Sequence, residues 1–370
     1  MSIQRLDNVF YPLGGMGYLV KNISDLFQEK VKGKGSIRLC FSAQPNSYPH
    51  LGTVMSIMVL FAIGEHLRER LNIPVYMQFD KGEHCIGDKK IVDGVVYSKS
   101  LEDVDMGGIS KADFYMKSFN QIFTRLSEWS SIPYKVKNYR ELQGEPFVRG
   151  TLLNILRRGK YIIPIISPSE RKFHLRFPCP ICKYSDKHGH YQEIEFRDFN
   201  SVQLVSNCFE HGKHSIVISE ENEDFFDINT ALYDLLLGAY LIETDREEKT
   251  VSIMIDGGDY AGVWPMLVHS EALLELGFHS IPNRLFAPLI LDWSGAKFSK
   301  SLYVKHGAYS YLPKGLLDFS QFEKDYGSKG FDRLWIEARE WANDPVKFFR
   351  NYSMDYFNLI LNQKENYLED

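Results

Sequence analysis

Three features that would point to other classes of protein are scarce or absent in this sequence. Its 370 residues include only five cysteines, an odd number that argues against a disulfide framework and fits a reducing cytoplasm. No apolar run approaches the roughly 20 residues that a membrane-spanning helix needs, and residues 1–5 lack the order of a secretory signal. We therefore expect a cytoplasmic protein that has no membrane association.

A strongly basic balance is also missing, since the net charge is −5. Any contact with nucleic acid must therefore be a local patch. Hydrophobic residues make up 44% and charged residues 25% of the chain, which is ordinary for a globular protein. The length is enough for one large domain with an insertion, or for two domains. With no internal repeat visible, the interpretation depends on local motifs.

A strand, a turn and a long helix follow one another in the first part of the chain. Residues 36–41 are apolar and predict a buried strand of a parallel sheet, and residues 44–49 have the composition of a turn. Apolar residues recur at helical spacing over residues 51–71, and residues 74–79 predict the next strand. This βαβ unit predicts a parallel α/β fold, in which nucleotides bind at the carboxyl ends of the strands.

The turn before this helix carries Pro49, His50, Gly52 and Thr53. His50 stands where unpaired backbone N–H groups and the helix dipole favour anions. Gly52 has no side chain, so a nucleotide can lie against the backbone there. The turn is therefore predicted to bind ATP, with His50 as a catalytic group near the phosphates.

A basic loop follows a predicted strand at residues 285–291. Lys297 and Lys300 flank Ser299, and Ser301 comes next. Two ammonium groups on one loop can stabilise negative charge on a departing pyrophosphate without covalent chemistry. We predict Lys297 and Lys300 as catalytic residues, with Ser299 and Ser301 as further ATP contacts.

Three of the five cysteines occur in a metal-binding pattern. Cys179 and Cys182 form a C-x₂-C pair, and Cys208 and His211 form a C-x₂-H pair after 25 intervening residues. Paired spacing of this kind lets two tight turns close a tetrahedral Zn²⁺ site. Four protein ligands leave no open position, so the predicted site is structural. His214 competes with His211 as the fourth ligand.

The stretches at residues 49–53 and 297–301, in this order, resemble the two signature motifs of class I aminoacyl-tRNA synthetases, HIGH and KMSKS. Pro45 and Asn46 extend the first match. Thr53 stands where a second histidine is usual, and Phe298 replaces methionine. The resemblance implies a Rossmann-like parallel sheet of the HIGH superfamily with an inserted connective subdomain.

Residues 114–182, with the cysteine pair at their end, are similar to the connective insertion of class I lysyl-tRNA synthetases. That group usually carries a large helical anticodon-binding domain after the lysine loop. Here residues 302–370 predict only a short helical C-terminal extension. The resemblance is therefore to a catalytic domain lacking most of that anticodon-binding domain.

The resemblance also implies a ribose site and an amino-acid pocket. In class I synthetases a Gly-x-Asp-like element before a helix binds the ribose hydroxyls. Its candidates here are Gly257, Gly258 and Asp259, with Asp256 as the alternative. The amino-acid pocket is expected at the ends of the first two strands, where the candidate residues are Ser42, Gln44 and Asp80.

The function predicted from these sites is ATP-dependent activation of an amino acid to an aminoacyl-adenylate, with lysine as the first candidate, followed by transfer to tRNA. Mg²⁺ is expected to accompany ATP, and Zn²⁺ to occupy the cysteine site. Three alternatives stay open: transfer to a non-tRNA acceptor, another HIGH-superfamily nucleotidyltransferase, and a non-catalytic tRNA-binding regulator.

The predicted organisation has four parts. Residues 1–110 form the first half of the nucleotide-binding domain, and residues 111–220 the connective insertion, with the zinc module at about residues 178–216. Residues 221–301 complete the catalytic domain, and residues 302–370 form the extension. A basic stretch from Arg149 to Arg176 is a candidate surface for the tRNA acceptor end.

Overall fold

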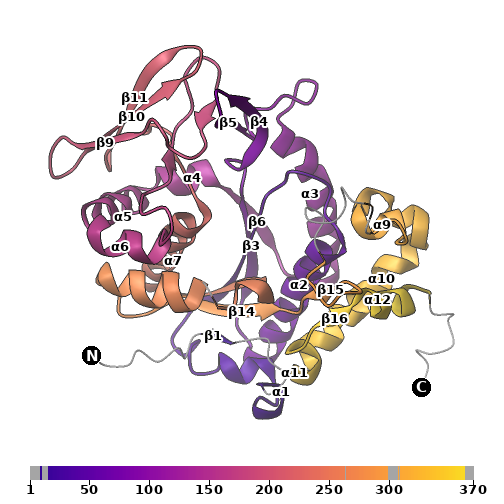
Figure 1. The fold of residues 1–370 in the computed structure, drawn as a ribbon. Coiled ribbons are helices and arrows are strands. Elements are labelled where there is room, and N and C mark those ends of the chain that lie inside the picture. The colour runs from indigo at the N-terminus through magenta and orange to yellow at the C-terminus, as the bar shows by residue number, and fades with distance from the viewer. Residues whose placement is uncertain (1–8, 11–15, 263, 299–306, 308, 363–370) are drawn as a thin grey trace.

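Six parallel strands form the central sheet, in the order β1-β14-β13-β2-β3-β6 (Figure 1). The computed structural model describes residues 9–10, 16–262, 264–298, 307 and 309–362. The predicted parallel α/β sheet is confirmed. The strands of the sheet are β1 (Val9–Phe10), β14 (Asn283–Ala287), β13 (Thr250–Gly257), β2 (Ser36–Ala43), β3 (Val75–Lys81) and β6 (Tyr134–Asn138).

Both faces of this sheet are buried, because alternate side chains of its strands enter two different cores. Leu39 and Phe41 of β2 belong to the core on one face, and Cys40 to the core on the other. Burial on both faces explains why the strands are apolar throughout. The first core includes α2 (Leu51–Leu71), α3 (Lys111–Ser130) and α10 (Phe322–Asn343); the second includes α5 (Pro146–Arg157), α6 (Gly159–Ile166), α7 (Thr230–Glu247) and the π-helix η3 (Trp264–Leu273).

Helix α2 connects β2 to β3 and packs against α3 and α10 (Figure 1). The prediction that no apolar run is long enough for a membrane-spanning helix was wrong by length and composition alone, since α2 meets both criteria. However, 72% of its apolar window is buried inside the protein. The helix is apolar nearly all round because it is enclosed by the sheet on one side and by other helices on the other. It begins directly after His50, its N-cap residue.

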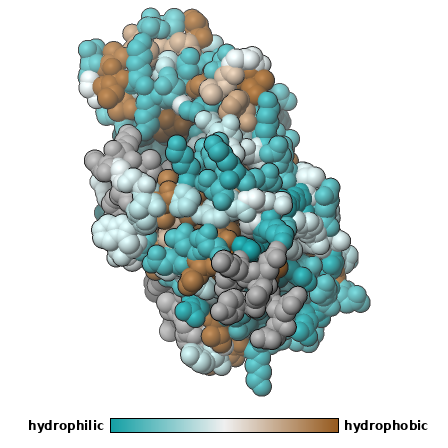
Figure 2. Space-filling view, turned by 90° about the vertical axis from the view of Figure 1, so that its right-hand side faces the viewer, coloured by the Kyte–Doolittle hydropathy of each residue, from teal (hydrophilic) through white to brown (hydrophobic). Residues whose placement is uncertain are grey.

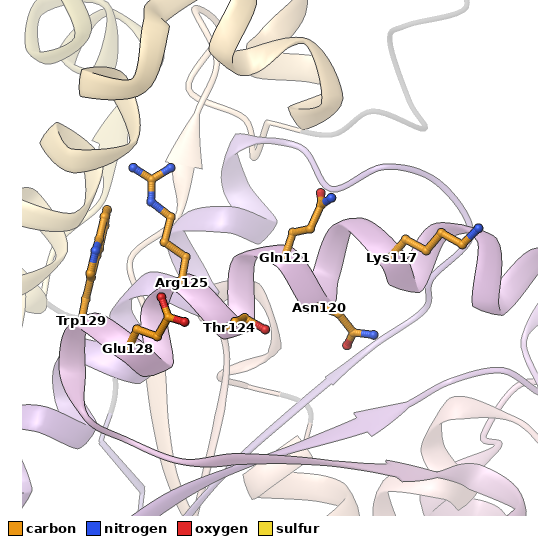
Figure 3. A pocket seen from close by; sticks show the side chains of 7 residues that line it. All are labelled: Lys117, Asn120, Gln121, Thr124, Arg125, Glu128 and Trp129. Atoms are coloured by element: carbon orange, nitrogen blue, oxygen red, sulfur yellow. The ribbon is translucent and has the colours of Figure 1, made fainter.

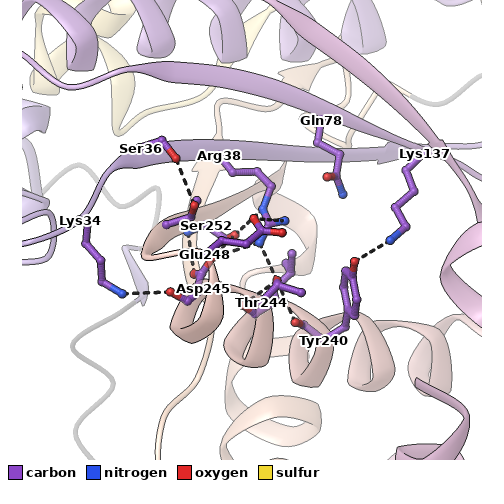
Figure 4. Close-up of polar contacts among 12 residues, drawn as sticks. Lys34, Ser36, Arg38, Gln78, Lys137, Tyr240, Thr244, Asp245, Glu248 and Ser252 are labelled. Atoms are coloured by element: carbon purple, nitrogen blue, oxygen red, sulfur yellow. Dashed lines mark hydrogen bonds and ion pairs between the residues drawn. The ribbon is translucent and has the colours of Figure 1, made fainter. Parts of the chain in front are cut away.

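A buried ion network joins β2, β13 and α7 at the amino end of the sheet (Figure 4). The guanidinium of Arg38 donates to Ser252 Oγ at 2.8 Å, to Thr244 Oγ1 at 2.7 Å and to Asp245 Oδ1 at 3.1 Å. Arg38 is only 1% exposed, so these partners compensate for the loss of water around its charge. Because Arg38 makes these hydrogen bonds within the protein, it connects β2 to β13 and α7 and stabilises the amino end of the sheet.

The insertion begins later than the sequence pattern indicates. We predicted it from residue 111, but α3 covers the central sheet and β6 pairs with β3. The chain leaves the central sheet only after Asn138. Next come α4 (Tyr139–Gly144), α5, α6, β7 (Leu175–Arg176), β8 (Ser185–Asp186), β9 (Glu193–Phe196), β10 (Val202–Cys208), β11 (Gly212–Ile218) and β12 (Asp227–Ile228).

A hairpin from the first half of the chain joins this insertion. We expected a long loop with short elements at residues 80–110, and the structure places β4 (Ile86–Val92) and β5 (Val95–Ser100) there. Strand β5 pairs with β4 and with β8 of the insertion, so the three strands form a small sheet. The inserted module therefore rests on residues that follow directly from β3.

The C-terminal part is mostly helical in its described residues, as predicted. Besides α10 it contains α9 (Lys314–Leu317), η5 (Phe319–Gln321), α11 (Pro345–Phe348), the short strand β16 (Tyr352–Ser353) and α12 (Met354–Asn362). Strand β16 pairs in parallel with β15 (Ile290–Leu291). The remaining short elements of the described residues are α1 (Met16–Leu19), η1 (Ile23–Leu26) and η2 (Gly258–Tyr260).

Candidate active site and metal centre

The turn between β2 and α2 is built around the side chain of His50. Its Nδ1 accepts a hydrogen bond from the Gly52 backbone N–H at 3.1 Å, which caps the helix. With Nδ1 as acceptor, a neutral ring carries its proton on Nε2, which lies 3.5 Å from Thr53 Oγ1. A Cβ at position 52 would come within 2.9 Å of the imidazole, so the glycine is required by the cap itself.

The lysine loop begins on a tight turn whose geometry is set by Asp292. One oxygen of this carboxylate accepts from the backbone N–H groups of Ser294 and Ala296, and the other accepts from the Tyr309 hydroxyl at 3.0 Å. Although burial opposes it, this hydrogen bonding lowers the pKa of Asp292. Gly295 closes the turn at a φ of +80°, which a side chain would disfavour. Lys297 then returns to pair with Leu291.

The two motifs meet at Phe298. Its ring lies 5.6 Å from the His50 ring, centroid to centroid, in an edge-on arrangement. Phe298 is 1% exposed and its ring also packs on that of Tyr309, so the surrounding side chains hold the Phe298 ring beside His50. His50 and Phe298, which lie far apart in the sequence and belong to different motifs, are therefore neighbours in the fold. Lys300, Ser299 and Ser301 fall outside the described residues.

The predicted ribose site contacts the lysine loop directly. Lys297 Nζ lies 2.6 Å from Asp259 Oδ2, at the carboxyl end of β13. Both side chains are partly exposed, at 41% and 30%. A Cβ at Gly257 would come within 2.6 Å of Asp259 Oδ1, so the glycine gives this carboxylate its place. Gly258 follows in the same turn, at the start of η2.

Asp256, the alternative for the ribose, is already engaged. Its carboxylate binds the Arg284 guanidinium at 2.5 Å, and Arg284 also binds Asp234 at 2.7 Å. Burial raises the pKa of Asp256 despite this partner. Burial would do the same to Asp234, but Arg284 lowers its pKa to about 2. The geometry therefore leaves Asp259 as the accessible acidic group at the end of β13.

At the ends of β2 and β3 the structure brings two of the three predicted pocket residues together. Ser42 and Asp80 face each other in register across the two strands, whereas Gln44 lies beyond the strand end and is exposed. Asp80 is 4% exposed; its Oδ1 accepts from Gln78, but its buried Oδ2 has no hydrogen-bond partner among the described residues. Burial raises the pKa of Asp80 to about 6. This oxygen is therefore a buried acceptor whose hydrogen-bonding capacity is unused among the described residues.

Sequence patterns did not indicate two aromatic residues beside this acceptor. Tyr233, from α7, lies near Asp80, whose charge adds to burial in raising the pKa of the Tyr233 hydroxyl. The His84 ring lies 5.6 Å from Tyr233 and 3.8 Å from Tyr139, centroid to centroid. Burial lowers the pKa of His84 to about 3, so its ring is neutral. The only sequence signal was the position of His84 shortly after a strand of the predicted sheet.

The four predicted metal ligands form one cluster. The ligand atoms of Cys179, Cys182, Cys208 and His211 lie within 4.8 Å of one another. Cys182 Sγ is 3.5 Å from Cys208 Sγ, and His211 Nδ1 is 3.5 Å from Cys208 Sγ. Thiolates at about 2.3 Å from a tetrahedral Zn²⁺ would be roughly 3.8 Å apart, so three sulfurs and one imidazole here fit that ion.

His214, the competing fourth ligand, points elsewhere. Its ring packs edge-on against Phe177 at 5.0 Å, and its Nδ1 lies 3.4 Å from the Gly212 carbonyl oxygen. The difference arises because Gly212 begins β11 with a φ of +72°, which turns the chain away after His211. Of the two histidines, only His211 has a ring nitrogen within the cluster.

The metal turns also hold the β4–β5 hairpin. Phe209, beside Cys208, packs on Tyr97 at 4.8 Å and lies under the Lys90 ammonium at 4.5 Å. The Tyr184 hydroxyl, two residues after Cys182, donates to Asp88 at 2.6 Å. The Cys/His cluster is therefore connected to the hairpin that follows β3.

The basic stretch from Arg149 to Arg176 does not form one exposed surface. Arg149 is fully buried and donates to the Ser219 carbonyl oxygen at 2.6 Å. Arg176 pairs with Asp227 at 2.7 Å. Arg157 lies over the exposed ring of Phe199 at 4.2 Å. Two of the cations that suggested a phosphate-binding face are thus used inside the fold.

The described surface on one side of the molecule is mainly hydrophilic (Figure 2). Figure 2 shows the side that carries the C-terminal helices, where the described hydrophobic residues stand in separate small groups. A depression of about 790 Å³ follows the outer side of α3 (Figure 3). None of the predicted site residues lines it. Its lining residues are Lys117, Asn120, Gln121, Thr124, Arg125, Glu128 and Trp129.

Comparison with known proteins gives similarities of structure only, since no family model and no curated protein matches the sequence. A Mycobacterium tuberculosis methionyl-tRNA synthetase bound by methionyl-adenylate is 13% identical, with a TM-score of 0.43 over 89% of this chain and 68% of that one. A structure described as an arginyl-tRNA synthetase from Campylobacter jejuni is 11% identical, with a TM-score of 0.36 over 85% and 68%.

A tryptophanyl-tRNA synthetase from Plasmodium falciparum is 9% identical, with a TM-score of 0.33 over 71% of this chain and 52% of that one. These similarities give no support to the lysyl resemblance in particular. With TM-scores below 0.5 they also establish no family for the chain. The functional interpretation therefore rests on the site geometry and on the two motifs.

Proposed function

We propose that this protein activates the carboxylate of an amino acid with ATP. The carboxylate oxygen attacks the α-phosphorus, the bond to the bridging oxygen breaks, and pyrophosphate leaves with that electron pair. The observation that carries the proposal is the meeting of the two motifs, with Phe298 on His50 and Lys297 beside Asp259. The proposal is supported by the arrangement of these groups, since a helix start that suits anions, the Asp259 carboxylate and the Lys297 ammonium lie at one edge of a parallel sheet.

In this proposal the chain contributes charge and position, not a nucleophile. His50 and the start of α2 hold the phosphates, and Asp259 accepts hydrogen bonds from the ribose diol. Lys297 moves from Asp259 to the departing pyrophosphate, since a partly exposed ion pair is worth little beside a polyphosphate. Lys300 supplies a second ammonium, and Mg²⁺ accompanies ATP.

The amino acid binds at the ends of β2 and β3. The unpartnered Oδ2 of Asp80 accepts a hydrogen bond from its ammonium group, and Ser42 lies opposite. Lysine stays the first candidate substrate, and the 3′ end of tRNA the first candidate acceptor. Zn²⁺ would be held by Cys179, Cys182, Cys208 and His211 as a structural ion, because four protein ligands fill its tetrahedral coordination.

The proposal is tested by pyrophosphate exchange into ATP, screened over the twenty amino acids and common non-protein ones. Exchange that depends on one amino acid supports it, and absence of exchange with all of them rejects the activation step. Exchange that depends instead on a phosphorylated non-amino-acid substrate indicates a different nucleotidyltransferase. Total tRNA, supplied with the activated amino acid, then shows whether the acyl group reaches RNA.

A further inference from the structure

The base of the lysine loop is tied to the rest of the protein through β15. Phe298 N–H donates to the Ile290 carbonyl oxygen at 2.8 Å, and Asp292 N–H donates to the Ala296 carbonyl oxygen at 2.8 Å. These bonds fold residues 290–298 into a small hairpin with Lys297 at its returning arm. Any shift of β15 therefore moves the ammonium and the ring that meet the nucleotide site.

Strand β15 is itself held by the C-terminal extension. The Leu289 N–H donates to Asn351 Oδ1 at 3.1 Å, and the Tyr352 N–H donates to the Leu289 carbonyl oxygen at 2.9 Å. Residues 290 and 291 then pair with residues 352 and 353 of β16 (Figure 1). The side-chain oxygen of Asn351 thus continues the backbone ladder by one more bond, at the point where the loop hairpin begins.

The extension is rigid at this position. The Tyr352 ring stacks on Trp341 of α10, with centroids 4.2 Å apart and planes 12° apart, and its hydroxyl donates to the Lys347 carbonyl oxygen at 2.7 Å. The same extension reaches the first motif, because the Phe319 N–H donates to the Pro49 carbonyl oxygen at 2.9 Å. One packed unit therefore contacts both halves of the nucleotide site.

We propose that Asn351 is a positioning residue for the lysine loop, and that the C-terminal extension is part of the catalytic unit. The inference rests on the proposed function for its effect on activation. The anchoring itself is a statement about the fold. Asn351 supplies a hydrogen-bond acceptor to β15 and thereby keeps Lys297 within reach of the pyrophosphate position.

The experiment compares Asn351→Ala, which removes the acceptor, with Asn351→Asp, which keeps an oxygen in its place. Tyr352→Phe is the matched control, because it removes only the hydroxyl bond to Lys347. We expect Asn351→Ala to lower kcat for pyrophosphate exchange about tenfold with little change in KM for ATP, since misplaced catalytic groups lose rate. Asn351→Asp should retain most of the wild-type kcat, and Tyr352→Phe should resemble the wild type.

Hydrogen exchange of residues 289–298 gives a readout that does not need activity. The amides of this segment should exchange faster in Asn351→Ala, while residues 330–342 of α10 keep their wild-type protection. Unchanged exchange and kcat in Asn351→Ala, or equal loosening of α10, would overturn the proposal. If the wild-type protein shows no pyrophosphate exchange, the proposed function fails, and hydrogen exchange alone still decides whether Asn351 anchors the loop.

Discussion

The candidate metal centre and the candidate nucleotide site are assembled in opposite ways. The four metal ligands lie between residues 179 and 211, on two turns with short spacings. His50, Asp259 and Lys297 follow three different strands and meet only because β2, β13 and β14 are neighbours in the sheet. The residues of a local site can be recognised from their spacing in the sequence. The residues of a dispersed site come together only through the order of the strands in the sheet.

Both regions contain buried side-chain atoms that have no hydrogen-bond partner among the described residues, and in the inserted module these include His214 Nε2 and Gln192 Nε2. Near the cysteine turns, the Tyr184 hydroxyl donates to Asp88 of β4. The Lys90 ammonium, also from β4, lies over the Phe209 ring and pairs with Glu210. At the carboxyl end of β3, Asp80 Oδ2 and His84 Nδ1 are buried without a hydrogen-bond partner among the described residues. Buried polar atoms are normally paired, and these two lie near the carboxyl ends of parallel strands, where ligands bind in open α/β sheets.

The largest expected effect comes from breaking the local site. Cys182→Ser should remove the metal and unfold the inserted module, since structural Zn²⁺ contributes roughly 10 to 16 kcal/mol to small zinc domains. Metal content and hydrogen exchange of residues 86–100 should change together, because the metal turns hold this hairpin. His214→Ala is the matched control and should keep the metal. Full zinc retention in the Cys182 variant would remove this residue as a ligand.

The dispersed site should respond in activity rather than in stability. Lys297→Ala should lower the pyrophosphate-exchange rate by about 10²–10³-fold, the loss expected for one group that stabilises transition-state charge. The thermal midpoint should hardly change, because the side chain is 41% exposed and its ion pair with Asp259 is weak. Equal losses in ATP affinity and rate would contradict a transition-state role.

The same difference decides what the sequence alone could predict. The helix at residues 51–71, the parallel strands and the two cysteine turns follow from apolar spacing and from C-x₂-C geometry, which are local. The choice between Asp256 and Asp259 is not local, since it depends on the Arg284 side chain from a neighbouring strand. The end of the central sheet at Asn138, later than predicted, likewise depends on a pairing with β3.

The aromatic surroundings of the proposed amino-acid pocket were not predictable for a further reason. Tyr233 belongs to a helix that follows the inserted module, and its ring meets those of His84 and Tyr139 only in the folded chain. Its neighbours in sequence are typical of a buried helix and carry no functional signal. Conversely, Arg149 has the sequence character of a surface cation, and only the fold shows it fully buried.

Two carboxylates at the end of β13 allow a residue that stabilises the fold, Asp256, to be compared with a proposed nucleotide-binding residue, Asp259. Asp256→Asn should lower the free energy of unfolding by about 1–3 kcal/mol, since it weakens a buried charged hydrogen bond to Arg284. Asp259→Asn should leave stability nearly unchanged and raise KM for ATP about tenfold, the worth of one hydrogen bond to the ribose. Thermal unfolding and exchange kinetics on both variants check this. Interchanged results would mean that the two carboxylates have been assigned the wrong roles.

The smallest expected effect concerns Asp80, at the carboxyl end of β3, whose buried carboxylate should lower the stability of the protein. Burial raises the pKa of Asp80 from 3.8 to about 6, so the native state binds its proton more tightly than the unfolded chain. Stability contributed by this group therefore falls as pH rises from about 4 to 6, and the cost is complete above that range. Asp80→Asn removes the titration and should stabilise the protein by about 1–2 kcal/mol at pH 8, with no gain at pH 4.

The same variant should lose affinity for the amino acid, because a neutral amide binds an ammonium group less well than a carboxylate does. Denaturant unfolding at pH 4 and pH 8, with KM for the amino acid, separates the two consequences. A variant that is less stable at both pH values would show that Asp80 supports the fold. A variant that gains stability at pH 8 while it loses the substrate would show that the dispersed site gives up stability for binding.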